Sequence, residues 1–251
     1  MKIGIIGTGN IGGTLARRFR RLGHEVYVAN SRGPESLTGL VAETGAIPVT
    51  VKEAARSGEV VIVAIPQNRV PDLPRDLFRG VPDDVIVADT GNYYPGLRDG
   101  RIAAIEQGAL DSQWVAQQLG RPVIKTFNNI YAKSLFESGA PRGTPGRIAL
   151  SVMGDSAAAK ATVLRLVDEL GFDPVDGGDL DNSWRQQPGT PAYCQDLDAV
   201  ALRRALAEAD RSQIAKYRAE AEDRARKYVA SLDSKTLRES MLLPSSVADR
   251  R

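Results

Sequence analysis

Residues 2–22, KIGIIGTGNIGGTLARRFRRL, decide the fold of this 251-residue chain. Residues 2–7 form an apolar run of strand length, and apolar side chains then recur at helical spacing, which predicts a helix near 10–22. Between them lies the pattern G-x-G-x-x-G, made of Gly7, Thr8, Gly9, Asn10, Ile11 and Gly12. A glycine-rich turn directly after a strand and at the start of a helix is typical of a site for the pyrophosphate of a dinucleotide.

The three glycines of this turn have separate expected roles. We expect Gly7 to permit the tight turn, Gly9 to let a pyrophosphate approach the backbone, and Gly12 to allow close packing of helix on strand. The amino end of the helix then offers N–H groups and a positive dipole end to the phosphates. Glycines also occur in strand-to-helix turns that bind no ligand, but the flanking strand and helix favour the nucleotide site.

Apolar segments of strand length alternate with segments of helical period along the chain. Nearly continuous Val and Ile runs are typical of strands covered by helices on both faces of a parallel sheet. We therefore predict an α/β fold, a doubly wound parallel sheet of the Rossmann type. The expected helices lie near 10–22, 34–44 and 68–79, and the expected strands are 2–7, 25–30, 59–66, 84–90, 121–127, 147–154 and 172–176.

The strand pattern ends at 177–178, which predicts a dinucleotide-binding domain over 1–177 and a smaller, mainly helical C-terminal part over 178–251. A long helix is expected at about 196–231. Its apolar stripe could be covered by the protein's own sheet or by a partner subunit, and we expect a homodimer that buries it. The stripe consists of Leu202, Leu206, Ala209, Tyr217, Ala221, Ala225, Tyr228 and Leu232.

The residues after the second expected strand bear on the choice of dinucleotide. An acidic residue there would accept a hydrogen bond from the ribose 2′-hydroxyl of NAD and would repel a 2′-phosphate. Asn30 removes that repulsion, Ser31 can donate a hydroxyl, and Arg32 can bind a phosphate through two charge-assisted hydrogen bonds. Ser36 lies one turn further along. The sequence therefore predicts NADP(H), against the alternative of a polar loop with an incidental arginine.

The ends of the third and fourth main strands supply further candidate contacts to the cofactor. Ligands of open α/β sheets bind along the carboxyl edge of the strands. We expect the nicotinamide side of the crevice there, although turn chemistry alone would also explain these residues. They are Ala64, Ile65, Pro66, Thr90 and Asn92.

Four stretches together, GTGNIG, NSR, DTGNYYP and VIKTFNNIYAKSL, resemble the family of F420-dependent NADP oxidoreductases, whose dinucleotide domain is similar to the cytosolic domain of STEAP metalloreductases. The resemblance covers roughly residues 1–155. It implies that NADPH exchanges hydride with a flavin or deazaflavin ring, commonly in a homodimer. By position it assigns the border of the hydride acceptor to Tyr93, Tyr94, Pro95, Asn128, Asn129 and Tyr131. The bulkier turn at 91–95 and the longer C-terminal part depart from the family, so the acceptor stays open.

Few side chains near the expected crevice can exchange protons. Lys125 and Asn129 have the K-x-x-x-N spacing of β-hydroxyacid dehydrogenases, but Lys125 ends a strand pattern, in which alternate side chains point to opposite sides. The catalytic residue is therefore unknown, with Asn128, Asn129, Tyr131 and Lys125 as candidates. His24 lies in a turn away from the crevice. Cys194 has no histidine to activate it and is expected to be a small buried side chain.

This scarcity of acids and bases favours direct hydride transfer to a flavin-like ring, which mainly requires two rings at near-contact distance. We expect an oxidoreductase that transfers hydride between NADPH and a flavin or deazaflavin (F420-like) acceptor. Two alternatives stay open: an NADPH-dependent reductase of a small carbonyl or imine, and a non-catalytic NADP(H)-sensing module. The sequence fixes neither the acceptor nor the direction of transfer.

The composition narrows the partners and the compartment. The 33 basic and 31 acidic side chains give a net charge of +2, which argues against a nucleic acid or a membrane surface as partner. No apolar segment reaches the ~18 residues that cross a bilayer. The single cysteine excludes an internal disulfide, and no His/Cys cluster suggests a metal site. We expect a cytoplasmic protein whose partner is a small-molecule hydride acceptor.

Overall fold

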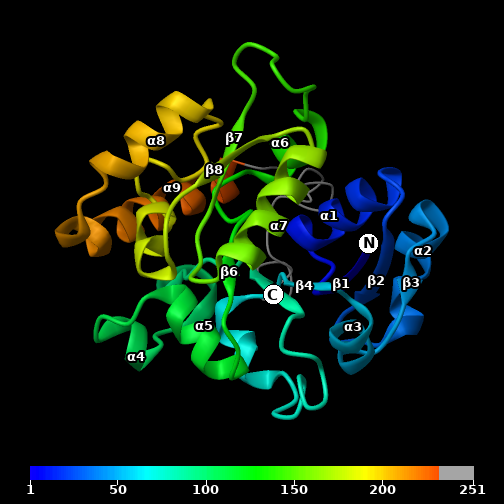
Figure 1. The fold of residues 1–251 in the computed structure, drawn as a ribbon. Coiled ribbons are helices and arrows are strands. Elements are labelled where there is room, and N and C mark those ends of the chain that lie inside the picture. Colours follow the sequence, from blue (N-terminus) through cyan, green and yellow to red (C-terminus); the bar gives the residue numbers. More distant parts are fainter. Residues whose placement is uncertain (232–251) are drawn as a thin grey trace.

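The computed structural model describes residues 1–231, which form a parallel six-stranded sheet with helices on both faces (Figure 1). The strands are β1 (Lys2–Ile6), β2 (Glu25–Ala29), β3 (Ile47–Pro48), β4 (Val60–Val63), β5 (Ile86–Asp89) and β6 (Ile124–Lys125). Their order is β3-β2-β1-β4-β5-β6, and every neighbouring pair is parallel. This is the order of a doubly wound dinucleotide-binding fold, so the predicted fold class is confirmed.

Alternate side chains of the strands enter different cores, as period-two geometry requires. Ile3 and Ile5 of β1 pack with Leu15 and Phe19 of α1 (Asn10–Arg21), together with residues of α7 (Ala157–Glu169). The side chain of Ile6 points to the opposite face of the sheet and packs against α3 (Val51–Ser57). Both faces of the sheet are therefore buried, which explains the continuous Val and Ile runs.

Four further helices lie between residues 38 and 137. They are α2 (Thr38–Thr44), α4 (Ala103–Glu106), α5 (Asp111–Leu119) and α6 (Ala132–Glu137). Helix α5 places Trp114 and Val115 in a second core with Val63 and Val87. In Figure 1 the blue half with β1 to β3 and the green half with α4 and α5 lie at opposite ends of the sheet.

Two predicted elements differ from the structure, and β3 and the helices α3 to α7 were not predicted. The helix expected near 68–79 is a short 3-10 helix, Gln67–Asp72, because Pro71 and Pro74 cannot continue an α-helix. The strand expected over 121–127 pairs only at Ile124 and Lys125. The sequence analysis assigned no element to β3 or α3, although Thr50 and Glu53 form a capping box at the start of α3.

The last two predicted strands are not part of the main sheet. β7 (Ala149–Val152) and β8 (Asp173–Asp176) form a separate parallel pair. An antiparallel bridge joins this pair to β6, since the amide of Lys125 donates to Met153 O at 2.8 Å and the amide of Met153 donates to Lys125 O at 3.0 Å. The boundary predicted at 177/178 stays a prediction.

The long C-terminal helix expected at 196–231 is two helices, α8 (Ala199–Glu208) and α9 (Ile214–Ser231). Asp210 separates them because its side chain accepts a hydrogen bond from Ser212 N at 2.9 Å and caps a new helical start. The C-terminal part is mainly helical, as predicted.

The apolar stripe of this segment is covered by the protein's own chain over α8, which corrects the expectation that a partner subunit covers it. Leu202 and Leu206 are buried against Met153 and Val175 beside the β7–β8 pair, and Ala209 packs with Trp184. The stripe on α8 therefore gives no reason to expect a homodimer. The side chain of Tyr228 and all of Leu232 lie outside the described residues.

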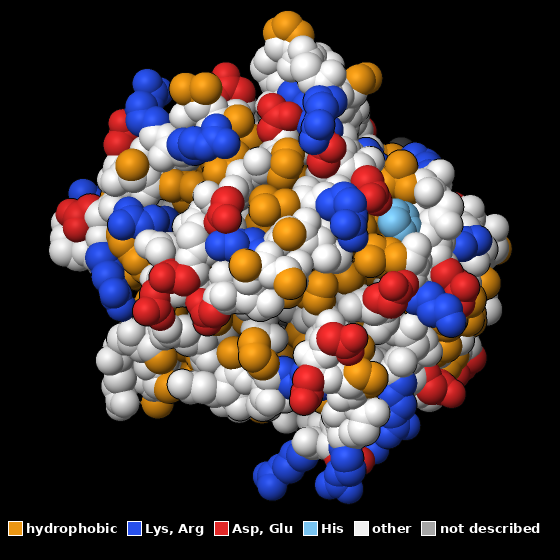
Figure 2. Space-filling view, in the orientation of Figure 1, with side chains coloured by type: hydrophobic (Ala, Val, Ile, Leu, Met, Phe, Trp, Pro, Cys, Tyr) orange, Lys and Arg blue, Asp and Glu red, His pale blue; other side chains and the backbone are white. Residues whose placement is uncertain are grey.

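Acidic and basic side chains are interspersed over most of the face shown in Figure 2. Within residues 1–231, none of the helices is both long and apolar enough to cross a bilayer. Within the same range, no three His, Cys, Asp or Glu side chains come together as a metal-binding group.

Candidate functional site

The glycine-rich turn between β1 and α1 has the geometry that the sequence predicted for a pyrophosphate site. Gly7 has φ +100°, and a β-carbon there would collide with Ala64 O. A β-carbon at Gly12 would collide with Gly7 O, so this glycine allows α1 to approach β1 closely. At Gly9, by contrast, no described atom lies within 4 Å of an added β-carbon. Space for a ligand therefore opens beside Gly9 and not beside the other two glycines.

The amino end of α1 faces the same space. Gly9 is the N-cap residue, and no side chain caps the helix there. Uncapped N–H groups and the positive end of the helix dipole suit the oxygens of a phosphate. Thr8, Asn10 and Ile11 keep part of their surface exposed around this end. The residues present thus fit a dinucleotide diphosphate.

The loop after β2 is held in shape by its own polar groups. Asn30 Nδ2 donates to Ser36 Oγ at 2.8 Å, and Asn30 Oδ1 accepts from the amide of Arg32 at 2.9 Å. The side chains of Ser31 and Arg32 are exposed. Arg32 has no ion-pair partner within the described part of the chain. Asn30 and Ser36 therefore shape a loop that presents a hydroxyl and a guanidinium outward.

Strand β4 is the neighbour of β1, so its end lies beside the glycine-rich turn, and the end of β5 lies one strand further along the sheet. Ala64, Ile65 and Pro66 keep part of their surface exposed at the end of β4, and the amide of Ala64 donates to Ile6 O at 2.8 Å. Thr90 is buried, with its hydroxyl 3.3 Å from Val63 O. Of these predicted cofactor contacts, Thr90 is engaged with its own backbone and the other three border open surface.

Beyond β5 and β6, three segments that are far apart in the sequence come together. Asn92 Nδ2 donates to Asn128 O at 3.1 Å, and Asn128 Nδ2 donates to Asn92 Oδ1 at 3.1 Å and to Gln186 O at 2.7 Å. The amide of Cys194 donates to Asn129 O at 3.0 Å. We call residues 92–99 the first wall and residues 186–196 the second wall of this region. The segment 125–131 lies between them.

The two walls also meet through a pair of tyrosines. The hydroxyls of Tyr94 and Tyr193 are 2.6 Å apart. Burial, more than any charge, raises the pKa of both phenols, so both stay neutral at physiological pH. Tyr131 is 54% exposed at the start of α6, and partial burial also raises its pKa. The region therefore presents neutral hydroxyls.

Tyr93, predicted as a contact to the acceptor, is instead a core residue. Its side chain has no exposed surface, and its hydroxyl donates to Glu106 Oε1 at 2.9 Å and accepts from the amide of Ile102 at 2.8 Å. Burial is the largest cause that raises its pKa to about 12. The alternation of side chains along the loop turns Tyr94 toward Tyr193 and Tyr93 into the core.

Lys125 is buried in an ion pair rather than placed on open surface. Its ammonium lies 3.0 Å from Asp89 Oδ2 and also donates to Gly91 O. Asp89 accepts from Ser112 Oγ at 2.8 Å and from the amide of Gly91 at 2.7 Å. Both side chains are almost fully buried. The network fixes the turn at 90–92, which leads into the first wall.

Backbone conformations that disfavour side chains gather where the second wall meets the segment before α6. Phe127, Cys194 and Asp196 have φ of 57°, 52° and 50°, the positive-φ residues other than glycine within residues 1–231. Each costs energy, and such residues cluster at functional sites. Asp196 accepts a hydrogen bond from Ser134 Oγ at 2.6 Å, which helps to fix this backbone. The second wall is therefore held in one specific conformation.

The sequence analysis missed Gln186 and Tyr193 because they lie about 60 residues or more beyond the segments they contact. Two other expectations concern Cys194, in the second wall, and His24, away from this region. Cys194 is buried, and burial raises its thiol pKa to about 12, which disfavours the nucleophilic thiolate. His24 is buried with Nε2 3.0 Å from Glu169 and edge-on to Phe19. Its contacts are structural.

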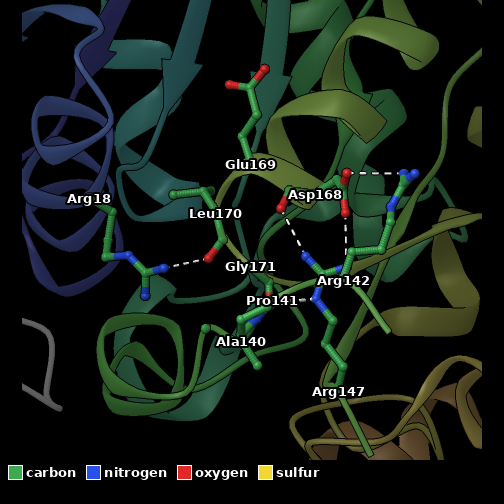
Figure 3. A pocket seen from close by; sticks show the side chains of 10 residues that line it. Arg18, Ala140, Pro141, Arg142, Arg147, Asp168, Glu169, Leu170 and Gly171 are labelled. Atoms are coloured by element: carbon green, nitrogen blue, oxygen red, sulfur yellow. Dashed lines mark hydrogen bonds and ion pairs between the residues drawn. The ribbon is translucent and has the colours of Figure 1, made fainter. Parts of the chain in front are cut away.

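A cavity of about 320 Å³ lies elsewhere, at the carboxyl end of α7 (Figure 3). Its arginines are engaged with that helix end. Arg147 donates to Asp168 O at 2.9 Å and to Gly171 O at 3.0 Å, and Arg18 donates to Leu170 O. Arginines that satisfy terminal carbonyls and meet the negative end of the dipole stabilise a helix. The hydrogen bond from Arg147 also lowers the pKa of Asp168. This cavity is therefore a structural feature.

Comparison with known proteins agrees with the geometry of the glycine-rich turn. A family model described as "NADP oxidoreductase coenzyme F420-dependent" matches residues 2–93. The Escherichia coli (strain K12) protein YjhV is 42% identical over 86 residues, which are 34% of this chain and 56% of YjhV. The match thus spans little more than half of that curated relative.

Two solved structures are similar over most of the chain. The hypothetical protein SMa0349 from Sinorhizobium meliloti is 32% identical, with a TM-score of 0.66 over 78% of this chain and 95% of that chain. A candidate F420-dependent NADP reductase from Arthrobacter sp. FB24 is 25% identical, with a TM-score of 0.59 over 73% and 87% of the two chains. Over residues 2–93, which include the glycine-rich turn, the chain is similar to the family of coenzyme F420-dependent NADP oxidoreductases.

Proposed function

We propose that the protein is an NADP(H)-dependent oxidoreductase that transfers hydride between NADPH and a flavin or deazaflavin ring. The observation that carries the proposal is the contrast between an open phosphate site beside Gly9 and a region beyond β5 and β6 in which Lys125 is buried against Asp89. The first suits a dinucleotide. The second supplies geometry and the neutral hydroxyls of Tyr94 and Tyr193.

The residues of the chain would divide the cofactor between two edges. Residues 7–12 and the amino end of α1 would bind the diphosphate, and Ser31 and Arg32 would bind the 2′-phosphate through a hydroxyl and a guanidinium. Ile65 and Pro66 would border the nicotinamide, with Asn92 on the far side. When bound, NADPH supplies the hydride, and every group of the chain acts by binding and orienting it.

Asn128 and Asn129 support an acceptor that carries polar ring edges. Both side chains are buried, and their Oδ1 atoms have no hydrogen-bond partner within residues 1–231. Such oxygens accept hydrogen bonds from a ring N–H group. Tyr94 and Tyr131 would contribute neutral hydroxyls. In this proposal these residues hold the acceptor at near-contact distance from the nicotinamide.

A reductase of a small carbonyl or imine is the second candidate, and the exposed hydroxyl of Tyr131 favours it. A 54% exposed phenol can reach a substrate and donate a proton to it. A non-catalytic NADP(H) sensor is the third candidate.

A cytoplasmic location and a homodimer belong to the same proposal. The composition supports the location, and the family resemblance alone supports the dimer, which light scattering on the purified protein would test.

The experiment mixes the purified protein with NADPH and, one at a time, F420, FMN, FAD, quinones, imines and ketones, and follows the nicotinamide absorbance. We expect oxidation with a flavin or deazaflavin, slowed in single turnovers by deuterium at the transferred position. Tyr131→Phe should reduce that rate by less than ~10²-fold, the lower end of acid–base catalysis. Turnover with ketones or imines alone, abolished by Tyr131→Phe, would establish the second candidate instead. Binding of NADPH without any oxidation would favour the sensor.

A further inference from the structure

Helix α9 contacts the first wall through two charged side chains. The buried carboxylate of Glu222 accepts a hydrogen bond from the amide of Gly96 at 2.7 Å. Arg226 Nη2 donates to Gly96 O at 3.2 Å and lies 3.4 Å from Glu222. Both polar groups of the Gly96 peptide units are thus engaged by the same helix. A β-carbon at Gly96 would lie 2.6 Å from Glu222 Oε2, so a larger residue there would force the end of the Glu222 side chain to move.

The same helix contacts the second wall through its backbone. A β-carbon at Gly189 would collide with Tyr217 O, and Gly189 has φ +86°. The second wall therefore approaches the backbone of α9 more closely than any residue with a side chain would allow. Tyr217 and Glu222 lie five positions apart on α9, so one helix reaches both walls.

Between these two contacts, Arg218 joins α9 to the main body. Its guanidinium lies 3.1 Å from Asp111 Oδ1 at the start of α5 and over the ring of Tyr93, with 4.7 Å to the ring centroid. Tyr93 is the core residue next to Tyr94. The helix is therefore fixed to the body at the point from which the first wall emerges.

The two walls also touch each other directly. The hydroxyls of Tyr94 and Tyr193 meet at 2.6 Å, so the walls are joined at one place by this pair and at another by α9. Because a pair of hydroxyls is a weaker constraint than a buried carboxylate and a backbone contact, α9 sets the separation of the walls.

We propose that α9 is a clamp on the hydride-acceptor site, in which Glu222 and the close contact of Gly189 with Tyr217 are positioning elements for the acceptor. The proposal rests on the proposed function, since it takes the two walls as the sides of that site. It assigns a role to the C-terminal part of the chain: α9 tunes binding of the acceptor, while the diphosphate and 2′-phosphate contacts proposed for NADPH, at residues 7–12 and 31–32, lie outside the two walls.

The activity test compares Glu222→Ala with two matched variants. Glu222→Ala removes the acceptor of the Gly96 amide, and a hydrogen bond to a charged group contributes about 1.5–3 kcal/mol. We expect the KM for the acceptor to rise about tenfold or more, with a much smaller change in the Kd for NADPH, whose phosphate contacts lie outside the walls. Glu222→Gln keeps an oxygen that can accept the hydrogen bond, so its KM for the acceptor should lie close to that of the parent protein. Glu220→Ala, on the exposed face of the same helix, should match the parent protein.

A test from the second wall uses two glycines with similar backbone conformation. Gly189→Ala forces a β-carbon against Tyr217 O, whereas Gly143 has φ +83° with no described atom within 4 Å of an added β-carbon. Both alanines carry the strain of a positive φ, but the first alone should raise the KM for the acceptor. Equal effects of the two would show that strain, and not the contact with α9, is responsible, and would overturn the clamp.

Hydrogen exchange followed by mass spectrometry tests the clamp without any turnover. In Glu222→Ala, peptides over 92–99 and 186–196 should exchange faster than in the parent protein, and peptides over 2–29 should not change. If none of the tested acceptors supports oxidation of NADPH by the parent protein but the exchange result holds, the proposed function fails and the clamp on these walls stands. If the parent is active while exchange and KM are unchanged in Glu222→Ala, the clamp fails and the function stands.

Discussion

The two edges of the crevice are built in opposite ways. On the nucleotide edge, the groups suited to a ligand lie in two short segments, the turn at 7–12 and the loop with Ser31 and Arg32, and Gly9, Ser31 and Arg32 are exposed. On the acceptor edge, polar groups from 89–95, 125–131 and 186–196 are buried and hydrogen-bonded to each other. The nucleotide edge keeps its charge for a ligand, and the acceptor edge uses its charge to hold its own shape.

This difference predicts whether removal of a cationic side chain lowers the stability of the fold or the affinity for the cofactor. Removing a cation from the acceptor edge should lower the stability of the fold, because a buried anion is left without its partner. Removing one from the nucleotide edge should lower the affinity for the cofactor and leave the fold unchanged. The next three predictions would break or sharpen this contrast.

The largest expected effect is that of Lys125→Ala. It leaves Asp89 buried without its ion pair, and breaking a buried pair on one side costs about 3–5 kcal/mol in the free energy of unfolding. Chemical denaturation measures this loss. The control is Lys133→Ala, at an exposed lysine just beyond the same segment, which should change the free energy of unfolding by less than ~0.5 kcal/mol. A variant that stays fully stable but loses turnover would identify Lys125 as a catalytic base or acid and overturn the contrast.

The next effect is a dependence of stability on pH at Asp111. Burial, opposed by Arg218 and Lys125 and reinforced by Asp89 and Asp99, raises its pKa from 3.8 to about 6. A carboxyl whose pKa is raised by folding binds its proton more tightly in the folded state. It therefore stabilises the fold below about pH 4, and this contribution is lost as the pH rises to about 6.

Asp111→Asn tests this dependence, because the amide does not titrate. Between about pH 4 and pH 6 the free energy of unfolding of the parent should fall relative to that of the variant, by up to about 3 kcal/mol, and the difference should be constant above pH 7. The unpaired Arg218 adds an offset that is the same at each pH. A difference that does not vary with pH would show that Asp111 titrates normally.

The smallest effect in free energy belongs to Arg32→Ala, and it should appear in binding alone. Loss of a hydrogen bond to a charged group costs about 1.5–3 kcal/mol, so the Kd for NADPH should rise about ten- to a hundredfold. The Kd for NADH and the unfolding midpoint should stay close to those of the parent. Fluorescence titration with both cofactors measures this. Equal losses for NADPH and NADH would remove the assignment of Arg32 to the 2′-phosphate.

The nucleotide edge could be predicted from the sequence because its determinants are local. The spacing of Gly7, Gly9 and Gly12 predicted a turn, a ligand approach and a helix contact within six residues; Gly7 and Gly12 have the predicted geometry, and the space beside Gly9 is open. The Val and Ile runs likewise predicted the parallel sheet, since a strand buried on both faces needs no partner to reveal its pattern.

The acceptor edge could be predicted only in part, because long-range contacts decide it. The sequence marked Asn92, Tyr94 and Asn128 as candidates, but the contacts with Gln186 and Tyr193 join residues 58 and 99 positions apart. Tyr93 and Tyr94 are equivalent in sequence terms, and the fold alone turns one into the core. The break between α8 and α9 was likewise hidden, since the apolar stripe continues across Asp210.

The short outer strands of the sheet bear on how copies of this protein behave at high concentration. An edge strand with a row of unpaired backbone groups invites a second chain to add to the sheet and to seed aggregation. Here β3 pairs over only two residues, one of them Pro48, and β6 is two residues long and already bridged by Met153. Neither outer strand offers a template long enough for such addition. The main sheet is thus protected from intermolecular strand pairing by the shortness of its outer strands.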